Sequence, residues 1–421
     1  MHTPPAVTPC LRLSLLSVLV ACSGGAPTPT APTPPPASTS PTRTPTPQPV
    51  LAVSTAPVPK VTSTPTALRT PLELTFVGDI IFGRYRADNT FDAIPGPDDH
   101  PFADIAELMR SDLLVGNLET PLTRDLPLNS PIGAQFRFGA SKDMARHLVD
   151  GGFTALSLAN NHAFDLRAQG MLDSPVILRE LGLVPLGASR TEPPVFRVEA
   201  IERQGWKVGF VAVTSRRNAP HFEGTPNLPF LSTNDFDATL GPLISAARAE
   251  HDLIVVFVHW GEEYEDSPGK HQQRAARALI DRGADLVVGH HPHVLQGIER
   301  HGRGAIAYSL GNFLFENTHE VPRLTGVLRA RFDARRCLET LTFHPAYIKR
   351  TPNKHPVPAT RGLGKLVRAR MTTLSEEFTT TFETRGEDLV LADFPCDGAV
   401  TPPRRPTPAT ARAPAPTPAT P

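Results

Sequence analysis

The segment Val287-Val288-Gly289-His290-His291-Pro292-His293-Val294 joins an apolar run to three histidines within four residues. A short continuous run of apolar residues is typical of a strand that is buried on both faces. On an extended backbone alternate side chains share a face, so His291 and His293 are expected to point the same way. Two neutral imidazoles on one face supply half of a transition-metal site. A surface histidine cluster is the alternative, but the buried run favours a metal-binding loop at the end of a strand.

Short apolar runs of the same kind recur along the chain. They lie at residues 74–77, 113–115, 154–158, 208–213, 253–258, 286–288 and 305–308. Helical patterns are found at residues 143–150, 272–282 and 363–378, and a strand pair is expected at 326–332 and 338–343. Strands that alternate with helices predict a layered α/β sandwich, and continuous hydrophobicity predicts that the strands are covered on both faces.

Five of these runs are followed directly by polar residues. The polar groups are Gly78-Asp79, Gly116-Asn117-Leu118-Glu119, Asn160-Asn161-His162 with Asp165 just beyond, His259-Trp260-Gly261-Glu262 and Gly289-His290-His291-Pro292-His293. Open α/β sheets form their sites at the carboxyl ends of the strands. We therefore expect these five loops to converge on a single site.

Each polar group also has a purely structural interpretation. Asp79 is a favoured helix-capping residue, and Asn117 with Glu119 is suited to fixing a turn. One of Asn160 and Asn161 is expected to occupy a left-handed turn position, which asparagine tolerates.

The remaining polar groups also allow both a structural and a functional interpretation. His162 and His259 fit either a site or a hydrogen-bonded place in the core. Trp260 is expected to pack or to form a pocket wall. Glu262 and Glu263 fit either a solvated surface or a contact with substrate.

The N-terminal part of the chain is expected to be a targeting signal followed by a spacer. Residues 1–21 contain an apolar run that is too short for a membrane anchor and fits the core of a secretory signal. The run ends before Cys22 and resembles a bacterial lipoprotein signal, in which Cys22 is the lipidated first residue of the mature chain. Residues 22–70 are rich in Pro, Thr, Ser and Ala, which predicts a disordered, extended linker. The protein is therefore expected outside the cytoplasm, anchored by lipid to the cell membrane or the outer membrane.

The globular domain is expected over residues 71–397, and a Pro-rich disordered tail over 398–421. Cys337 and Cys396 are the two cysteines of that domain, and outside the cytoplasm they fit either a disulfide or two free thiols. Lys and Arg together number 42, as do Asp and Glu, so the formal net charge is zero. This balance gives no sign of a nucleic-acid partner.

Six motifs, taken together, resemble one known family. They are Val77-Gly78-Asp79, Gly116-Asn117-Leu118-Glu119, Ala159-Asn160-Asn161-His162, His259-Trp260-Gly261, Gly289-His290-His291-Pro292-His293 and Ser309-Leu310-Gly311-Asn312-Phe313. Their order is similar to that of the CapA family of bacterial poly-γ-glutamate capsule synthesis, whose fold is that of calcineurin-like metallophosphatases. The resemblance implies a four-layer αββα sandwich with two mixed sheets.

The resemblance also implies a metal site. Its predicted ligands are Asp79, Glu119, Asn161, His259, His291 and His293. Glu119 is the expected bridging carboxylate. His162 is the expected general acid, with Asp165 orienting its ring, and the expected substrate contacts are Asn117, Glu262 and Asn312.

One position departs from the metallophosphatase pattern. Those enzymes typically carry a histidine two residues after the first aspartate, and this chain has Ile81 there. The site is therefore expected to hold one divalent ion, or two with altered coordination, and Mn, Zn, Mg and Fe all remain open.

The leading functional hypothesis is a metal-dependent hydrolase or transferase acting on an anionic polymer or peptide such as poly-γ-glutamate. The alternative is a non-catalytic polymer-binding or export component that works with the subunits of a membrane synthase. A third possibility is an extracytoplasmic metallophosphoesterase. A shared fold does not choose between these activities.

Overall fold

The computed structural model describes residues 69–396, apart from 89, 96–98, 132–136, 191–194, 219–225, 318 and 351–353. The predicted signal peptide, Cys22, nearly all of the linker and the tail lie outside the described residues. Among the helices that are described, none combines the length and the apolar character that a membrane span requires.

The larger sheet has ten strands and is mixed. Its order is β20-β21-β18-β17-β1-β4-β8-β9, with β16 beside β1 and β19 beside β18. Strands β1, β4, β8, β9 and β16 run parallel to one another, whereas β17 pairs antiparallel with β1 and all pairs among β17 to β21 are antiparallel. The bounds are β1 Leu72–Ile80, β4 Leu113–Leu118, β8 Ala155–Ser157, β9 Val184–Leu186, β16 Asn312–Leu314, β17 Leu324–Phe332, β18 Leu338–Ile348, β19 Pro356–Pro358, β20 Glu383–Arg385 and β21 Asp388–Ala392.

The smaller sheet has six strands in the order β10-β11-β12-β13-β15-β14. Its four central strands are parallel and its two edge strands are antiparallel. The bounds are β10 Glu199–Arg203, β11 Trp206–Thr214, β12 Leu253–His259, β13 Leu286–His290, β14 Ile298–His301 and β15 Gly304–Ala307. Short strands form two further small sheets, from β2 Gly83–Tyr85, β3 Phe91–Ala93 and β6 Arg137–Phe138, and from β5 Leu122–Thr123 and β7 Ala140–Ser141.

The two large sheets pack face to face, and one apolar cluster fills the space between them. Phe76 of β1 meets Phe257 of β12 there, with ring centroids 5.7 Å apart. Because alternate strand residues face opposite ways, the neighbours of these residues in the sequence point outward, and Val77 and Val256 belong to the two outer clusters. Both faces of each strand are thus buried, which explains the continuous apolar runs.

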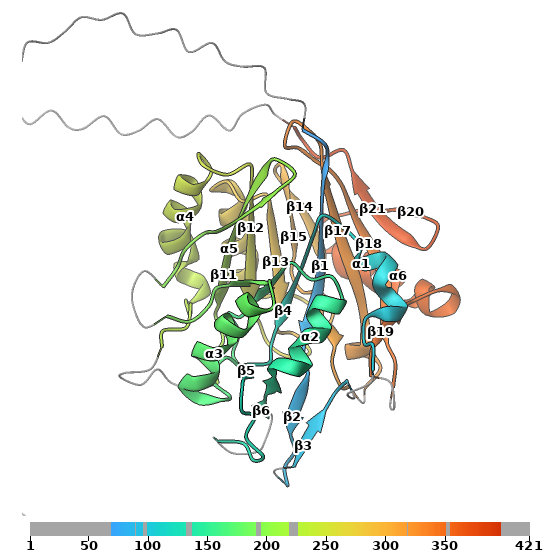
Figure 1. Cartoon of the computed structure of the whole chain (residues 1–421). Helices are drawn as coiled ribbons and strands as arrows, with labels where there is room; N and C mark the ends of the chain where they lie inside the picture. Colours follow the sequence, from blue (N-terminus) through green and yellow to red (C-terminus); the bar gives the residue numbers. More distant parts are fainter. Residues whose placement is uncertain are drawn as a thin grey trace, which may run out of the picture. The chain divides into compact units, whose positions relative to one another are not determined.

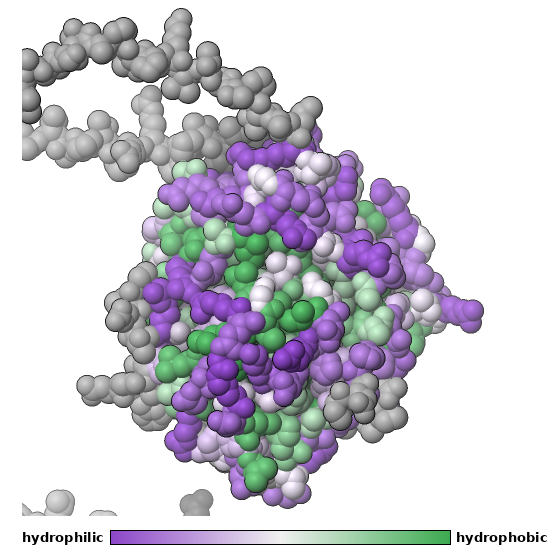
Figure 2. All heavy atoms as spheres, viewed as in Figure 1, coloured by the Kyte–Doolittle hydropathy of each residue, from purple (hydrophilic) through white to green (hydrophobic). Residues whose placement is uncertain are grey.

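Helices cover the outer face of each sheet (Figure 1). The larger sheet is covered by α1 (Ala106–Met109), α2 (Lys142–Asp150) and α3 (Arg167–Glu180), and the smaller by α4 (Phe236–Ala247) and α5 (Lys270–Asp281). Helix α6 (Arg361–Glu376) contributes Val367 and Met371 to the cluster between the sheets. The prediction of a four-layer αββα sandwich with two mixed sheets is confirmed. Figure 2 shows the face that carries α2 and α3, where hydrophilic residues surround smaller hydrophobic areas.

Every predicted strand and helix is present within a few residues of its expected position. Helices α3 and α4 were not predicted, and each contains an internal proline, Pro175 or Pro242. A proline lacks the amide hydrogen that a helix interior uses, so it disguises a helix in the sequence. The open question about the two domain cysteines is answered by a disulfide between Cys337 and Cys396, whose Cα atoms are 5.4 Å apart.

Candidate metal centre

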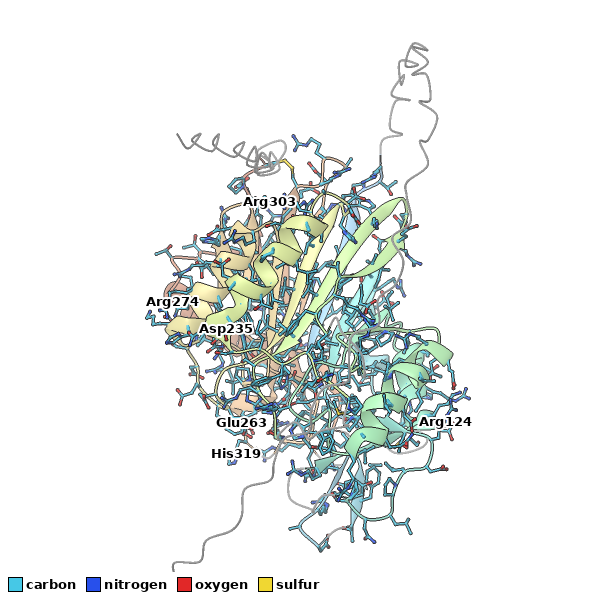
Figure 3. The ribbon with its side chains drawn as sticks, turned by 90° about the vertical axis from the view of Figure 1, so that its left-hand side faces the viewer. Arg124, Asp235, Glu263, Arg274, Arg303 and His319 are labelled. Atoms are coloured by element: carbon cyan, nitrogen blue, oxygen red, sulfur yellow. A yellow bond between two sulfur atoms is a disulfide. The ribbon has the colours of Figure 1, made fainter. Side chains whose placement is uncertain are left out.

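The polar residues that follow the strands meet at one end of the sandwich. In the larger sheet, Asp79 of β1 lies beside Asn117 of β4 and Asn312 of β16. In the smaller sheet, His259 of β12 lies level with His290 of β13. The parallel strands therefore end together, and the loops that follow them converge as expected. In Figure 3, Glu263, which follows β12, lies at the lower end of the sandwich, and Arg303, which precedes β15, lies at the upper end.

The three adjacent histidines have different orientations. His290 still belongs to β13, is buried, and lies between the sheets with its ring stacked on Phe257 at 5.4 Å. Its Nε2 is 3.2 Å from the Val77 carbonyl oxygen. His291 and His293 lie beyond the strand with φ angles of 98° and 58°. The expectation that an extended backbone aligns their rings is therefore wrong. A left-handed turn directs the rings of His291 and His293 to the site, whereas His290, which belongs to the strand, points away from it.

Glycine at position 289 permits this turn to lie close to β15. A Cβ atom there would meet the Tyr308 carbonyl oxygen at 1.9 Å. The indole nitrogen of Trp260 donates to the same oxygen at 3.0 Å and its ring is buried, which confirms that this tryptophan is a packing residue. The expectation that Asn160 or Asn161 occupies a left-handed turn position is wrong, since neither residue has a positive φ.

Two groups of three side chains could each hold a metal ion, and they share one carboxylate. One group is Asp79, Glu119 and His293, and the other is Glu119, His259 and His291; within each group the ligand atoms lie within 4.8 Å of one another. All five side chains are buried. The prediction that these residues lie together is confirmed, and Asp79 lies in a strand, so it does not cap a helix.

Glu119 is the shared residue, and within the described part of the chain neither of its carboxylate oxygens has a hydrogen-bond partner, although the side chain is fully buried. Its Oε1 lies 3.4 Å from His259 Nε2 and 3.9 Å from His162 Nε2. Both ring nitrogens of His291 are also buried without a partner. A buried carboxylate without donors is strongly unfavourable. A divalent cation between these groups would satisfy both.

The electrostatics of the two carboxylates also favour a bound cation. Burial, followed by repulsion from Glu119, raises the pKa of Asp79 to about 8. Burial also raises the pKa of Glu119 above its usual range. Asp79 and Glu119 lie close together in a low-dielectric interior, and two carboxylates in that arrangement favour a positive charge between them.

The histidines are held in the form that binds metals. Burial, followed by the neighbouring histidines, lowers the pKa of His259 and of His291 well below the usual value. Both rings are therefore neutral at physiological pH, and a neutral imidazole has a lone pair for an ion. Asn161 Oδ1, another predicted ligand, lies 2.7 Å from His259 Nε2 at the same place.

His162 is placed beside the ligands rather than among them. Its Nδ1 lies 2.7 Å from Asp165 Oδ2, and its Nε2 faces Glu119. Burial opposes protonation, but the charge and hydrogen bond of Asp165 outweigh it and raise the pKa of His162. The Phe138 ring covers it at 4.1 Å, and the Phe138 backbone N–H donates to Asp165 at 2.8 Å. Asp165 therefore fixes the orientation of the His162 ring toward the site and favours its protonated form.

Two of the three predicted substrate contacts take a different position. Asn117 is fully buried, and its Nδ2 donates to Asp79 Oδ1 at 2.9 Å. Asn312 is fully buried behind His293, whose Nδ1 lies 2.8 Å from Asn312 Oδ1. Because both amides are covered by the ligands they hold, we correct their assignment to positioning residues. The third, Glu262, is exposed and pairs with Arg216 at 2.5 Å.

A sixth loop, which the sequence analysis did not include, also reaches the centre. Residues 215–218 follow β11, and the side chain of Asn218 lies 3.1 Å from Asn161 and 3.5 Å from the His162 ring. The signal was available, because the predicted strand at 208–213 is followed by Ser215-Arg216-Arg217-Asn218, another polar group after a strand. Glu263 was weighed between a solvated surface and a contact with substrate, and the structure also groups it with His291 and His293.

Comparison with known proteins agrees with this site. The family model described as "Bacterial capsule synthesis protein PGA_cap" matches residues 73–317, which contain every predicted ligand. The chain belongs to the PGA_cap family. The matched part ends before β17, so the PGA_cap match does not include the antiparallel strands β17 to β21 of the larger sheet.

Two curated relatives lie at about one-third identity. "Capsule biosynthesis protein CapA" of Bacillus anthracis is 33% identical over 252 residues, covering 58% of this chain and 60% of the relative. "PGA biosynthesis protein CapA" of Bacillus subtilis (strain 168) is 35% identical over 251 residues, covering 58% of this chain and 63% of the relative. The chain thus spans less than two-thirds of the length of these PGA_cap relatives.

Among solved structures, the chain is similar to a 5'-nucleotidase from Candida albicans SC5314, at 10% identity and a TM-score of 0.40. That match covers 73% of this chain and 58% of the other. We draw no conclusion from a likeness at this level.

Proposed function

We propose that this protein is a metal-dependent hydrolase or transferase that acts outside the cytoplasm on an anionic cell-envelope polymer of the poly-γ-glutamate type. Membership of a bacterial capsule synthesis family supports the polymer. The apolar run that ends at Cys22 supports export and lipid anchoring to a membrane. The disulfide between Cys337 and Cys396 fits an oxidising compartment.

The single observation that carries the proposal is Glu119. It is fully buried with two unpartnered oxygens, and it belongs to both groups of potential ligands. A carboxylate shared by two groups is suited to bridging two ions, as in two-metal hydrolytic sites. Mixed nitrogen and oxygen donors favour Mn, Zn or Fe over Mg, which prefers oxygen alone.

A bound divalent ion would supply Lewis acidity and hydroxide at neutral pH. The side chains of this protein account for the rest. Asp79, Glu119, His259, His291 and His293 would hold the ion, and Asn117 and Asn312 fix the orientation of Asp79 and His293. Phe138 keeps water from one face of His162.

His162 is the group that can release a proton to the leaving group. In hydrolysis of an amide, a water oxygen bonds to the carbonyl carbon and the C–N bond breaks, so the departing nitrogen must gain a proton. His162 Nε2 faces the centre and can donate it, while Asp165 retains the hydrogen bond to Nδ1. Water restores the proton to the ring afterwards.

The test uses protein without residues 1–21, loaded with Mn²⁺ or Zn²⁺ and offered γ-linked glutamate oligomers and a phosphodiester. Cleavage of the oligomers that disappears in His162→Gln, but persists in the exposed-histidine control His100→Gln, would support the proposal. Metal-loaded protein that turns over neither substrate would contradict it, and cleavage of the phosphodiester alone would favour a phosphoesterase.

One observation favours the non-catalytic alternative. Ile81 stands where metallophosphatases carry a metal-binding histidine, and it is fully buried in an apolar cluster. Metal content measured after gentle purification separates the two candidates. A tightly held ion that is lost in His291→Ala supports chemistry, whereas protein without any ion supports a polymer-binding role.

A further inference from the structure

A polar groove leads from the metal centre along the smaller sheet. Its first part is a cavity of about 300 Å³, lined by Asn161 and His291 of the centre and by Arg216. Its second part is a cavity of about 620 Å³ that extends to Gln272 in the first turn of α5. The two cavities share Ser215, Arg216 and Phe230, so they meet at the loop that follows β11. We refer to both parts together as the Arg216 groove.

The far part of the groove contains a hydrogen-bond donor without an acceptor. Gln272 is only 7% exposed, and its Nε2 is buried without a partner among the residues that the structure describes. Its Oε1 is occupied, because it accepts from the Gly269 backbone N–H at 2.8 Å and so caps α5. A buried amide nitrogen without an acceptor is unfavourable unless a ligand supplies an oxygen.

The junction of the groove contains a cation. Arg216 lies between the two cavities, and its Nη2 pairs with Glu262 Oε2 at 2.5 Å. The two side chains are 36% and 69% exposed, so the pair is open to solvent and to exchange. Such an exposed pair contributes little stability. A ligand oxyanion could therefore replace Glu262 on Arg216 at small cost.

We propose that the Arg216 groove binds the next unit of an oxyanion-bearing chain whose reacting bond lies at the metal centre. Arg216 pairs with the anionic group of that unit, and Gln272 Nε2 donates to an oxygen one step further along. Glu262 holds Arg216 in place until the chain arrives. This inference rests on the proposed function, and it adds that the substrate is recognised as an extended chain rather than as a single residue.

The chemistry of the groove limits the ligand. Its two available groups are donors, one of them charged, so the ligand must present acceptor oxygens, as carboxylates or phosphates do. Each of the two cavities has the volume of a small-molecule site, so together they offer room for a ligand longer than one unit. A γ-linked glutamate chain and a polyol-phosphate chain both meet these requirements.

The experiment is a titration of protein without residues 1–21, first in chelator and then with Mn²⁺. The probes are a γ-linked glutamate pentamer, free glutamate and a glycerol-phosphate pentamer. Arg216→Gln is expected to weaken pentamer binding by roughly 10- to 100-fold, the loss of a charge-assisted hydrogen bond. Gln272→Glu is expected to weaken it about tenfold, since it keeps the oxygen that caps α5 but repels an anion.

A variant that is expected to bind the pentamer more tightly shows that the losses in the other variants do not come from misfolding. Glu262→Gln removes the competing carboxylate and is expected to bind the pentamer about threefold more tightly. Arg274→Gln, an exposed residue of the same helix (Figure 3), is the matched control and is expected to bind as the unmodified protein does. Whichever pentamer binds more tightly identifies the carboxylate or the phosphate as the source of the oxyanion.

The inference is overturned if Arg216→Gln and Gln272→Glu bind both pentamers within about twofold of the unmodified protein, or if free glutamate binds as tightly as the pentamer. These outcomes are separable from failure of the proposed function. Arg216 and Gln272 are not metal ligands, so the titration in chelator tests the groove even if the protein binds no ion and cleaves nothing.

Discussion

The two large sheets contribute different chemistry to the centre. The loops of the ten-stranded sheet supply oxygen and amide groups, with Asp79, Asn117, Glu119 and Asn161, together with His162. The loops of the six-stranded sheet supply the imidazoles of His259, His291 and His293. Each of the two ligand groups takes at least one residue from each sheet. Neither of these two groups is complete within one sheet, so metal binding by them depends on the packing of one sheet against the other.

The largest effect is expected at the residue shared by both groups. Glu119→Gln removes the bridging charge and keeps the shape, so turnover of the substrate should fall by about 1,000-fold or more, and metal content should fall with it. Steady-state kinetics and metal analysis measure the two quantities. The exposed carboxylate variant Glu107→Gln on α1 is the control. Unchanged metal content in Glu119→Gln would contradict the two-sheet centre.

A second prediction concerns Asp79, which comes from the ten-stranded sheet, in the metal-free protein. The pKa of Asp79 is raised to about 8 from 3.8, so the folded state retains a proton that the unfolded state releases above pH 4. The stability of the metal-free protein therefore loses an Asp79 contribution as pH rises from about 4 to about 8. Asp79→Asn lacks this loss and should gain up to about 6 kcal/mol relative to the unmodified protein across that window.

The measurement is urea unfolding of both proteins in chelator at several pH values. Only the slope of the difference with pH decides, because the substitution also has a pH-independent effect on the hydrogen bonds from Asn117 and His291. A difference that does not change with pH would show that Asp79 is ionised in the folded protein.

A third prediction uses two adjacent histidines of the nitrogen side. His291→Gln should weaken Mn²⁺ binding about 100-fold and leave the stability of the metal-free protein nearly unchanged, because both ring nitrogens lack partners. His290→Gln should do the reverse and cost about 2 kcal/mol of stability, since its ring stacks on Phe257 and bonds to Val77. Calorimetric titration and urea unfolding compare them. If both variants changed metal affinity and stability in the same way, His290 and His291 would not have different roles.

The smallest effect is expected behind the ligands. Asn312→Ala frees the ring of His293 without removing a ligand, so metal affinity should fall about tenfold. Asn312→Asp keeps an acceptor for His293 Nδ1 and should retain most of the affinity. If the alanine variant instead binds metal normally but binds substrate poorly, Asn312 contacts substrate as the sequence had suggested.

Several parts of this centre were predictable because they are local in the sequence. The strands are continuous apolar runs, and Asp79, Glu119, His162 and His259 directly follow them or lie close behind. Proline inside α3 and α4 concealed two helices that tertiary packing stabilises. The opposite orientations of His290 and His291 were also hidden, since they depend on a left-handed turn that the pattern of residues does not display.

By itself, the sequence determined which residue types follow each strand, and hence that carboxylates, amides and imidazoles would gather at one edge. Only the tertiary structure decided which of them face the ion. Asn117 and Asn312 became supports, Arg216 and Asn218 joined from a sixth loop, and Glu119 came to lie without a partner between the sheets. The physical reason is that strand order and turn conformation fix where each side chain points. Metal ligation requires the ligand atoms to lie within a few ångströms of one another, so it depends on those orientations.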